Sequence, residues 1–296
     1  MNSIEKALQK KNQQVSEQPQ KESSVTANNA NDLKESSVES PSVVVPPPPS
    51  GNKVNIEIDF QSLEAKGFVS TNSQRQLINE EYRAIKRKLL DNAFGPLSKS
   101  LKNGNIIMVS SSRPGEGKTF TAINLALSIA LEQDKTVLLV DADVLKPNVM
   151  RTLEQKNTVG LMEYLLGEKD NISDVMCTTN LDNLRIIPAG KSHHLSTELL
   201  ASEKMQEAMQ EFATRYPDRV VIVDTPPLLG INETAILANL AGQALVVVEE
   251  SKTKLADVSK AVEQLNPEMA IGFVVNKSEK ANSDGAGYGY YYAGAN

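Results

Sequence analysis

The sequence predicts an α/β protein with a doubly wound, mostly parallel sheet flanked by helices. Two observations favour this fold class. Several short segments consist almost only of Val, Ile and Leu, and they alternate with amphipathic segments of helical length. Such apolar strands are typical of sheets that are buried on both faces, and their alternation with helices is typical of parallel, doubly wound sheets.

Each expected element follows from its residue pattern. Runs rich in β-branched and other aliphatic residues predict the strands, and apolar residues spaced three or four apart predict the helices. We expect strands at 105–109, 136–140, 184–187, 219–223, 244–248 and 271–275. We expect helices at 79–92, 118–133, 201–215, 233–240 and 254–265.

The composition divides the 296 residues into four parts. Residues 16–55 are Pro- and Ser-rich, include four prolines at 46–49 and precede the first aromatic residue, so we expect a disordered linker. Residues 1–15 carry apolar side chains at helical spacing and are a candidate docking helix, although a frayed tail that binds nothing fits equally well. Residues 56–280 read as the folded domain, and 281–296 as a flexible, tyrosine-rich tail.

The overall composition excludes several classes of protein. A single Cys excludes an internal disulfide framework and multi-cysteine metal sites. A net charge of −6 argues against a nucleic-acid partner. The chain has no run of about 18 apolar residues and no apolar stretch in its first ten residues. We therefore expect a cytoplasmic protein.

A phosphate-binding loop is predicted between the first expected strand and the helix at 118–133. Residues 112–119 (SRPGEGKT) fit the P-loop pattern except that Ser112 replaces the first glycine. Gly115 and Gly117 allow backbone N–H groups to turn toward phosphate oxygens. Lys118 is expected to reach the β- and γ-phosphates, and Thr119 to offer its hydroxyl to Mg²⁺. The predicted ATP-binding residues here are Gly115, Glu116, Gly117, Lys118, Thr119 and Phe120. The alternative is a tight glycine turn without a ligand.

Acidic and amide side chains follow three other expected strands. Asp141 and Asp143 end one strand, and at this spacing in an extended segment they are expected to point the same way, toward Mg²⁺ and a phosphoryl acceptor. Asp224 ends an apolar strand of the Walker B type, whose aspartate helps to hold Mg²⁺. Asn276 could offer its amide to a purine edge. For each of them the alternative is an ordinary turn or cap residue.

Four of the seven tyrosines lie in the last nine residues. They are Tyr288, Tyr290, Tyr291 and Tyr292. Behind a predicted ATP site, this cluster is a candidate phosphorylation substrate. The alternative is a low-complexity adhesive end.

Together, these motifs resemble those of the bacterial tyrosine kinases, P-loop proteins related to the MinD and ParA ATPases. The resemblance covers about residues 75–292 and includes the tyrosine-rich end, which separates this family from its relatives. Within the family the sequence is most similar to autokinases associated with exosortase-type exopolysaccharide loci, because residues 4–8 read IEKAL and residues 80–87 read EEYRAIKR.

The resemblance implies a role for each matched residue. Lys118 and Thr119 would bind ATP and Mg²⁺, and Asp224 would support the metal. Asp141 would help to deprotonate the acceptor tyrosine, and Asp143 would ligate Mg²⁺. The implied catalytic set is thus Lys118, Asp141 and Asp143, and the implied metal set is Thr119, Asp143 and Asp224.

The family also implies a ring of protomers packed through an E-x-x-R-x-x-R helix. Glu80, Arg83 and Lys86 occupy these positions, with a lysine in place of the last arginine, which forms bidentate pairs that lysine cannot form. The alternative is a solvated charged helix face. Further implied partners are a separate membrane polysaccharide co-polymerase as activator and a cognate tyrosine phosphatase, which would place the chain at the inner face of the cell membrane.

The leading hypothesis is a non-specific protein-tyrosine kinase that phosphorylates its own tail in trans and regulates exopolysaccharide polymerisation, export and chain length. A second hypothesis is a MinD/ParA-like ATPase that positions cellular cargo. Arg113 argues against it, because ParA-type loops carry a signature lysine at that position. A third is an ATP-sensing scaffold without enzymatic activity.

Overall fold

The structure is a computed structural model that describes residues 54–70, 76–96 and 98–278. The candidate docking helix at 1–15, nearly all of the linker predicted at 16–55 and the four tail tyrosines lie outside these residues. Residue 55, the predicted end of the linker, already belongs to the first described strand.

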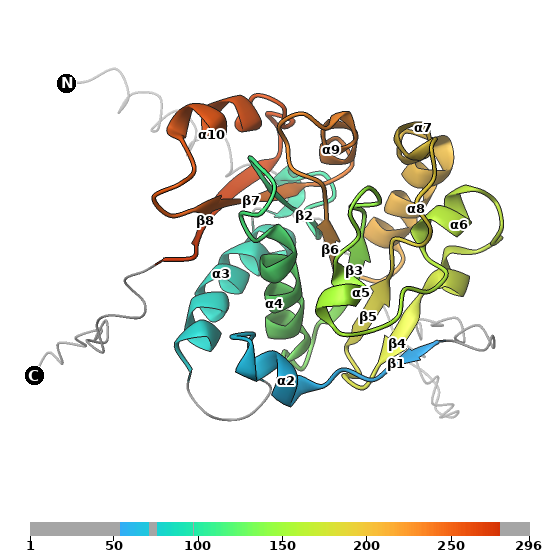
Figure 1. The fold of residues 1–296 in the computed structure, drawn as a ribbon, viewed down its shortest axis with the longest axis horizontal. Helices are drawn as coiled ribbons and strands as arrows, with labels where there is room; N and C mark the ends of the chain where they lie inside the picture. Colours follow the sequence, from blue (N-terminus) through green and yellow to red (C-terminus); the bar gives the residue numbers. More distant parts are fainter. Residues whose placement is uncertain (1–53, 71–75, 97, 279–296) are drawn as a thin grey trace, which may run out of the picture. The chain divides into compact units, whose positions relative to one another are not determined.

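The described residues form a sheet of eight strands in the order β1-β4-β5-β3-β6-β2-β7-β8 (Figure 1). All neighbouring strands are parallel except β4 and β5, which confirms the predicted α/β class. The strands are β1 Asn55–Ile56, β2 Ile106–Ser111, β3 Thr136–Asp141, β4 Cys177–Thr179, β5 Leu184–Ile187, β6 Arg219–Asp224, β7 Gln243–Glu249 and β8 Ala270–Asn276.

Helices cover both faces of the sheet. The helices are α2 Phe60–Ala65, α3 Leu77–Phe94, α4 Lys118–Ala130, α5 Val149–Thr152, α6 Leu161–Leu165, α7 Ser196–Leu200, α8 Glu203–Thr214, α9 Asn232–Ala238 and α10 Leu255–Val262, with short 3₁₀ turns at Ser98–Ser100 and Ile172–Val175. Side chains of α2, α3, α4 and α5 share one apolar core with the sheet. Those of α6, α7, α8, α9 and α10 share the other core.

Alternating side chains of the central strands explain the two cores. On β2, Ile107 and Val109 face the α4 side, whereas Ile106 and Met108 face the opposite side. Successive side chains of a strand point to opposite faces, so a strand between two helical layers needs apolar residues at every position. This requirement explains the unbroken Val, Ile and Leu runs of the sequence.

The register of the central strands gathers the polar strand ends. β6 lies between β3 and β2, with Asp141 opposite Asp224 and Asp224 opposite Val109. Because these strands are parallel, their carboxyl ends meet at one edge of the sheet, where open α/β sheets bind ligands. The P-loop and the acidic strand ends are therefore neighbours.

Several short elements were not predicted. The strands β1 and β4 and the helices α2, α5, α6 and α7 have two to six residues each, too few to show a clear period. Cys177, the single cysteine of the chain, begins β4 and is buried. Across the described residues, no helix is long and apolar enough to cross a membrane.

Candidate active site

The loop between β2 and α4 has the backbone shape of a phosphate cradle. Gly115 and Gly117 have φ values of 89° and 102°, a region that favours glycine. A Cβ on Gly117 would lie 1.9 Å from Asn276 Nδ2, so a larger residue at this position would have to displace the Asn276 amide. Ser112 is not among the positive-φ residues, which explains why serine can replace the first glycine of the pattern.

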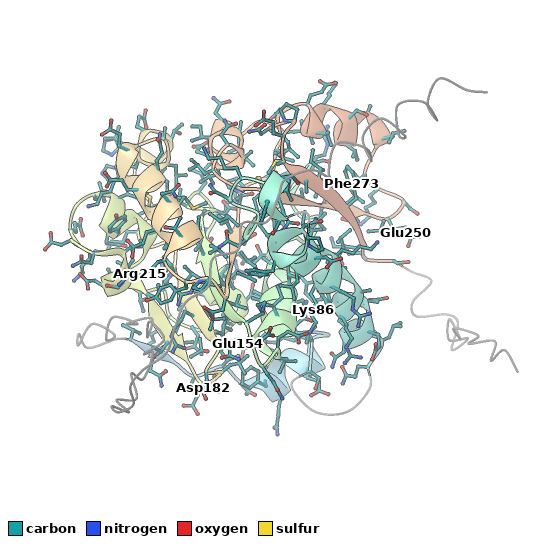
Figure 2. The ribbon with its side chains drawn as sticks, turned by 180° about the vertical axis from the view of Figure 1, so that it is seen from behind. Lys86, Glu154, Asp182, Arg215, Glu250 and Phe273 are labelled. Atoms are coloured by element: carbon teal, nitrogen blue, oxygen red, sulfur yellow. The ribbon has the colours of Figure 1, made fainter. Side chains whose placement is uncertain are left out.

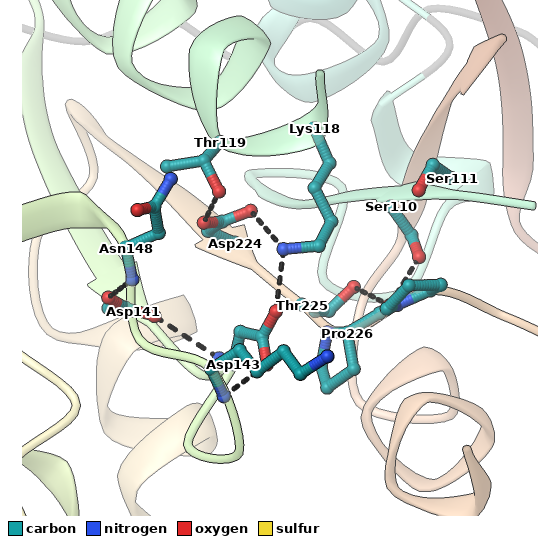
Figure 3. Close-up of polar contacts among 12 residues, drawn as sticks. Ser110, Ser111, Lys118, Thr119, Asp141, Asp143, Asn148, Asp224, Thr225 and Pro226 are labelled. Carbon is teal, nitrogen blue, oxygen red and sulfur yellow. Dashed lines mark hydrogen bonds and ion pairs between the residues drawn. The ribbon is translucent and has the colours of Figure 1, made fainter. Parts of the chain in front are cut away.

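Lys118, the first residue of α4, extends to the acidic strand ends (Figure 3). Its Nζ lies 2.6 Å from Asp143 Oδ2 and 3.9 Å from Asp224 Oδ1. Burial of the ammonium group opposes its charge, but Asp224 and Asp143 outweigh this effect and raise the pKa of Lys118. The lysine is therefore held as a cation beside the carboxylates of two strands.

Asp224 has one oxygen that accepts a hydrogen bond and one that does not. The Thr119 hydroxyl donates to its Oδ2 at 2.7 Å, as Figure 3 shows. Its Oδ1 is buried and accepts no hydrogen bond from any described residue. Burial raises the pKa of Asp224 to about 6, against the opposing effect of Lys118. A buried acceptor beside a threonine hydroxyl fits a metal-bound water, so Thr119, Asp143 and Asp224 fit the predicted Mg²⁺ set.

Asp141 and Asp143, which we expected to point the same way, have different partners, since Asp143 pairs with Lys118 and Asp141 accepts from backbone N–H groups. The Asp141 carboxylate accepts hydrogen bonds from the backbone N–H groups of Asp143, Asn148 and Val149 at 3.2, 3.2 and 3.0 Å. β3 ends at Asp141, and the loop that follows folds over the Asp141 side chain. The chain is therefore no longer extended beyond Asp141, and the alternation of side chains along a strand does not continue to Asp143. Burial and the nearby Asp224 raise the pKa of Asp141 to about 8. The expected base is thus covered by loop 142–148.

A cavity of about 710 Å³ opens beside the P-loop. One part of its wall is made by Gly115, Gly117, Lys118, Thr119 and Asp143. The rest of its wall includes Phe68, Phe120, Leu145, Lys146, Pro147, Asn148, Arg151 and Ile231. The phosphate cradle and the predicted metal ligands therefore line one hollow that also has apolar and cationic walls.

Lys146 and Arg151 belong to this wall but were not predicted as site residues. Both are on the stretch that follows β3. The rule that ligands bind beyond the carboxyl ends of parallel strands could have drawn attention to them. Neither residue matches a motif by itself, however, and their approach to the P-loop depends on the path of the loop.

Other predicted binding residues lie around the P-loop and contact it. Asn276 Nδ2 donates to the Glu116 carbonyl at 2.9 Å, so the amide nitrogen contacts the P-loop backbone, and the contact of Asn276 with a purine edge stays a prediction. The Glu116 carboxylate accepts from Arg113 N–H and from the Thr253 hydroxyl, at 2.9 and 2.6 Å. Phe120 packs against Phe68 at the cavity wall.

The three predicted oligomerisation residues on α3 have different surroundings. Glu80 and Arg83 are exposed and form an ion pair with each other. Lys86 is 8% exposed, donates to the Ser128 carbonyl of α4 at 2.8 Å and pairs with Glu132. Figure 2 shows Lys86 on the side of the molecule opposite to the view of Figure 1. Two of the three side chains are thus available for contact with another protomer, and Lys86 is engaged within its own chain.

Comparisons with known proteins support the kinase interpretation of this site. The family model of an AAA domain matches residues 104–270. Tyrosine-protein kinase YwqD of Bacillus subtilis is 33% identical over 228 residues, which cover 76% of this chain and 91% of YwqD. The kinase domain of Escherichia coli tyrosine kinase ETK has the same fold, with a TM-score of 0.59, 26% identity and coverage of 80% of this chain and 94% of the ETK domain.

Some relatives are much longer than this chain. The putative tyrosine-protein kinase EpsB of Ralstonia nicotianae is 33% identical over 189 residues, which make up 64% of this chain but 25% of EpsB. The similarity to such proteins is therefore limited to one part of their length.

Proposed function

This chain belongs to the bacterial tyrosine kinase family, and from that premise we propose that it transfers the γ-phosphoryl group of ATP to tyrosines of its own tail. The proposed acceptors are Tyr288, Tyr290, Tyr291 and Tyr292, presented by a neighbouring copy of the chain. We propose tyrosine as the acceptor because the chain belongs to this family, and we propose that the residues of the site bind the nucleotide and catalyse the transfer.

One observation supports this proposal most strongly. The side chains of four residues converge from α4, the loop after β3 and the end of β6. Lys118 Nζ lies 2.6 Å from Asp143 Oδ2, and the Thr119 hydroxyl donates to Asp224 Oδ2 at 2.7 Å. Three of them, Lys118, Thr119 and Asp143, line the cavity beside the P-loop. Phosphoryl transfer depends on charge neutralisation and in-line positioning more than on covalent chemistry, and a convergent set of this kind supplies both.

The residues would share the work as follows. The P-loop N–H groups and Lys118 would bind the phosphates, and Thr119, Asp143 and Asp224 would hold Mg²⁺. When bound, Mg²⁺ supplies positive charge to the phosphate oxygens. The tyrosine oxygen would attack the γ-phosphorus while the bond to the bridging oxygen of ADP breaks, and the phenolic proton would pass to a carboxylate.

We propose Asp141 as that proton acceptor, with one structural condition. Its carboxylate is fully buried and accepts hydrogen bonds from backbone N–H groups of loop 142–148 and of Val149, the first residue of α5. The loop must therefore open, or a water must connect the two groups, before the tyrosine hydroxyl can reach it. Opening of this loop would also widen the cavity at Lys146 and Asn148.

The resemblance suggests a wider role for this activity. We propose that cycles of tail phosphorylation and removal by a cognate phosphatase control a ring of protomers. A membrane polysaccharide co-polymerase would hold the ring at the inner face of the membrane and activate it. The output would be control of exopolysaccharide polymerisation, export and chain length.

Phosphate mapping after incubation with Mg-ATP tests the kinase activity. The full chain is incubated with Mg-ATP and its tail peptide is analysed by mass spectrometry. We expect phosphate on Tyr288, Tyr290, Tyr291 or Tyr292, and none in a Lys118→Met variant. Lys99→Met is the matched control, because Lys99 is an exposed lysine that does not line the cavity. ATP turnover without phosphotyrosine would instead indicate a MinD/ParA-like ATPase, and ATP binding without turnover a scaffold.

Mixing two complementary variants, one without an active site and one without the acceptor tyrosines, tests transfer between copies. The Lys118→Met chain keeps its tyrosines, and a chain with all four tail tyrosines replaced by Phe keeps its active site. Transfer in trans predicts phosphate on the Lys118→Met chain only when both chains are present. If the mixture stays unphosphorylated while the wild-type chain reacts, the transfer occurs within one chain.

A further inference from the structure

The outer side of the P-loop is held by two residues that end β8 and follow it. Asn276 Nδ2 donates to the Glu116 carbonyl at 2.9 Å, and Lys277 Nζ donates to the Gly115 carbonyl at 2.6 Å. These two carbonyls belong to consecutive peptide units of the loop. β8 is the edge strand beside β7 (Figure 1), so the contacts join the sheet edge to the P-loop.

Because of the geometry of the peptide unit, these two contacts also determine the orientation of two backbone N–H groups. A trans peptide is planar, and its C=O and N–H bonds point to opposite sides. If Lys277 holds the Gly115 carbonyl outward, the N–H of Glu116 points to the opposite side. In the same way, Asn276 turns the N–H of Gly117 to the opposite side. For a loop that binds phosphate through its N–H groups, that side is the inner one.

Further contacts hold Lys277 and the P-loop in place. Lys277 also pairs with Glu249 at 2.9 Å, and Glu249 N–H donates to the Thr253 hydroxyl at 2.8 Å. Thr253 in turn donates to the Glu116 carboxylate. Lys277 has a φ of 59°, a conformation that a non-glycine residue adopts at some cost. The cost is consistent with a side chain that has to reach a defined point.

We propose that Asn276 and Lys277 are positioning residues that orient the phosphate-binding N–H groups of Glu116 and Gly117. Because Gly115 and Gly117 leave the loop conformationally permissive, an unbraced loop would have to be ordered by the nucleotide itself, which lowers affinity. In this role Asn276 acts on phosphate binding and not on recognition of the base. The proposal rests on nucleotide binding by this site, and its test therefore measures binding and not phosphotyrosine.

We call the two hydrogen bonds from Asn276 and Lys277 to the P-loop carbonyls the brace. Removal of the Lys277 ammonium group tests it. We expect Lys277→Met to weaken binding of Mg-ATP about tenfold, equivalent to about 1.4 kcal/mol, which is close to the lower end of what hydrogen bonds to charged groups contribute. Lys252→Met is the matched control, because it removes another ammonium group that pairs with the same Glu249 carboxylate. We expect the control to bind within about twofold of wild type and Lys277→Arg to recover most of the affinity.

Comparison of three ligands separates phosphate positioning from base recognition. Mg-ATP, Mg-GTP and Mg-tripolyphosphate are each titrated against wild type, Lys277→Met and Asn276→Ala, by competition with a fluorescent ATP analogue. The brace predicts that affinity for all three ligands falls by a similar factor in both variants. A change in the ratio of ATP to GTP affinity in Asn276→Ala, with tripolyphosphate binding unchanged, would show that Asn276 reads the base and would overturn its assignment.

Two further outcomes keep the failures distinct. If Lys277→Met binds Mg-tripolyphosphate with the affinity of the wild-type chain, the brace is overturned and the kinase proposal stays intact. Failure of the wild-type chain to bind any of the three ligands would overturn the nucleotide site itself. Thermal unfolding of each variant is recorded first. If Lys277→Met is unfolded, the affinities of Lys277→Arg and Lys277→Gln are compared in its place. We then expect a loss of affinity only for Lys277→Gln.

Discussion

Asp224 occupies a fully buried position in which only one of its two oxygens accepts a hydrogen bond. The Thr119 hydroxyl satisfies Oδ2, and Lys118 Nζ lies 3.9 Å from Oδ1. An unsatisfied buried acceptor is costly, and a cation bound at Asp224 Oδ1 would offset this cost. At the scale of single residues, the site thus favours ligand binding over its own stability.

The hydrogen bond from Thr119 to Asp224 can be tested by a double-mutant cycle. Thr119→Ala leaves the buried carboxylate without this donor, and we expect the free energy of unfolding to fall by about 1–3 kcal/mol. In the Asp224→Asn background the loss should be smaller, because an unpaired amide is less costly than an unpaired carboxylate. Urea unfolding in EDTA without nucleotide measures all four proteins.

Thr119→Ser is the control for this cycle, since it keeps the hydroxyl. It should unfold close to wild type. Equal losses for Thr119→Ala in both backgrounds would mean that the hydroxyl stabilises something other than the Asp224 carboxylate.

At the scale of elements, Lys86 fastens α3 to the end of α4. Its Nζ donates to the Ser128 carbonyl in the last turn of α4 and pairs with Glu132 just beyond that helix. A cation is favourable at a helix C-terminus, where carbonyl groups lack partners within the helix. This placement gives Lys86 a structural role within its own chain.

Substitution of Lys86 separates this task from a role in oligomer contact. We expect Lys86→Met to lower the free energy of unfolding by about 1–2 kcal/mol at a protein concentration where the chain is monomeric. Arg83→Met should leave it within about 0.5 kcal/mol, because Arg83 pairs with Glu80 at an exposed site.

The opposite pattern would contradict the assignment. If Lys86→Met unfolds like wild type in urea but elutes as a smaller species in gel filtration, Lys86 acts between protomers. Arg83→Met is measured in both assays as the control, because Arg83 is an exposed residue of the same helix.

Some of these elements and contacts could be predicted from the sequence, and others could not. The long strands and helices follow from their apolar periods, and the P-loop and its acidic neighbours follow from motifs whose residues are close in the chain. The cover over Asp141 could not be predicted, because it depends on where the loop after β3 turns. The contact of Lys277 with Gly115 joins residues 162 positions apart, and no local pattern indicates such a pairing.

At the scale of the whole molecule, the tail begins where the P-loop is braced. Tyr288 is 11 residues beyond Lys277 in the sequence, and an extended chain spans about 3.3–3.6 Å per residue. The segment from Lys277 to Tyr288 can therefore span at most about 36–40 Å. This length does not by itself decide between transfer in cis and in trans, which the mixing experiment tests.

Phosphorylation of this tail should change how copies of the chain associate. Each phosphate adds about −1.5 to −2 charges, so four would add about −6 to −8 to a formal net charge of −6. If tails meet near the same sites in a ring, this added charge repels them, and we expect ATP-treated protein to elute as a smaller species than phosphatase-treated protein. Because salt screens exposed charges beyond about 8–10 Å near physiological ionic strength, the difference should shrink at higher salt. A chain with Phe at all four positions should elute identically after either treatment, whereas identical elution of the two wild-type samples at low salt would show that tail charge does not control assembly.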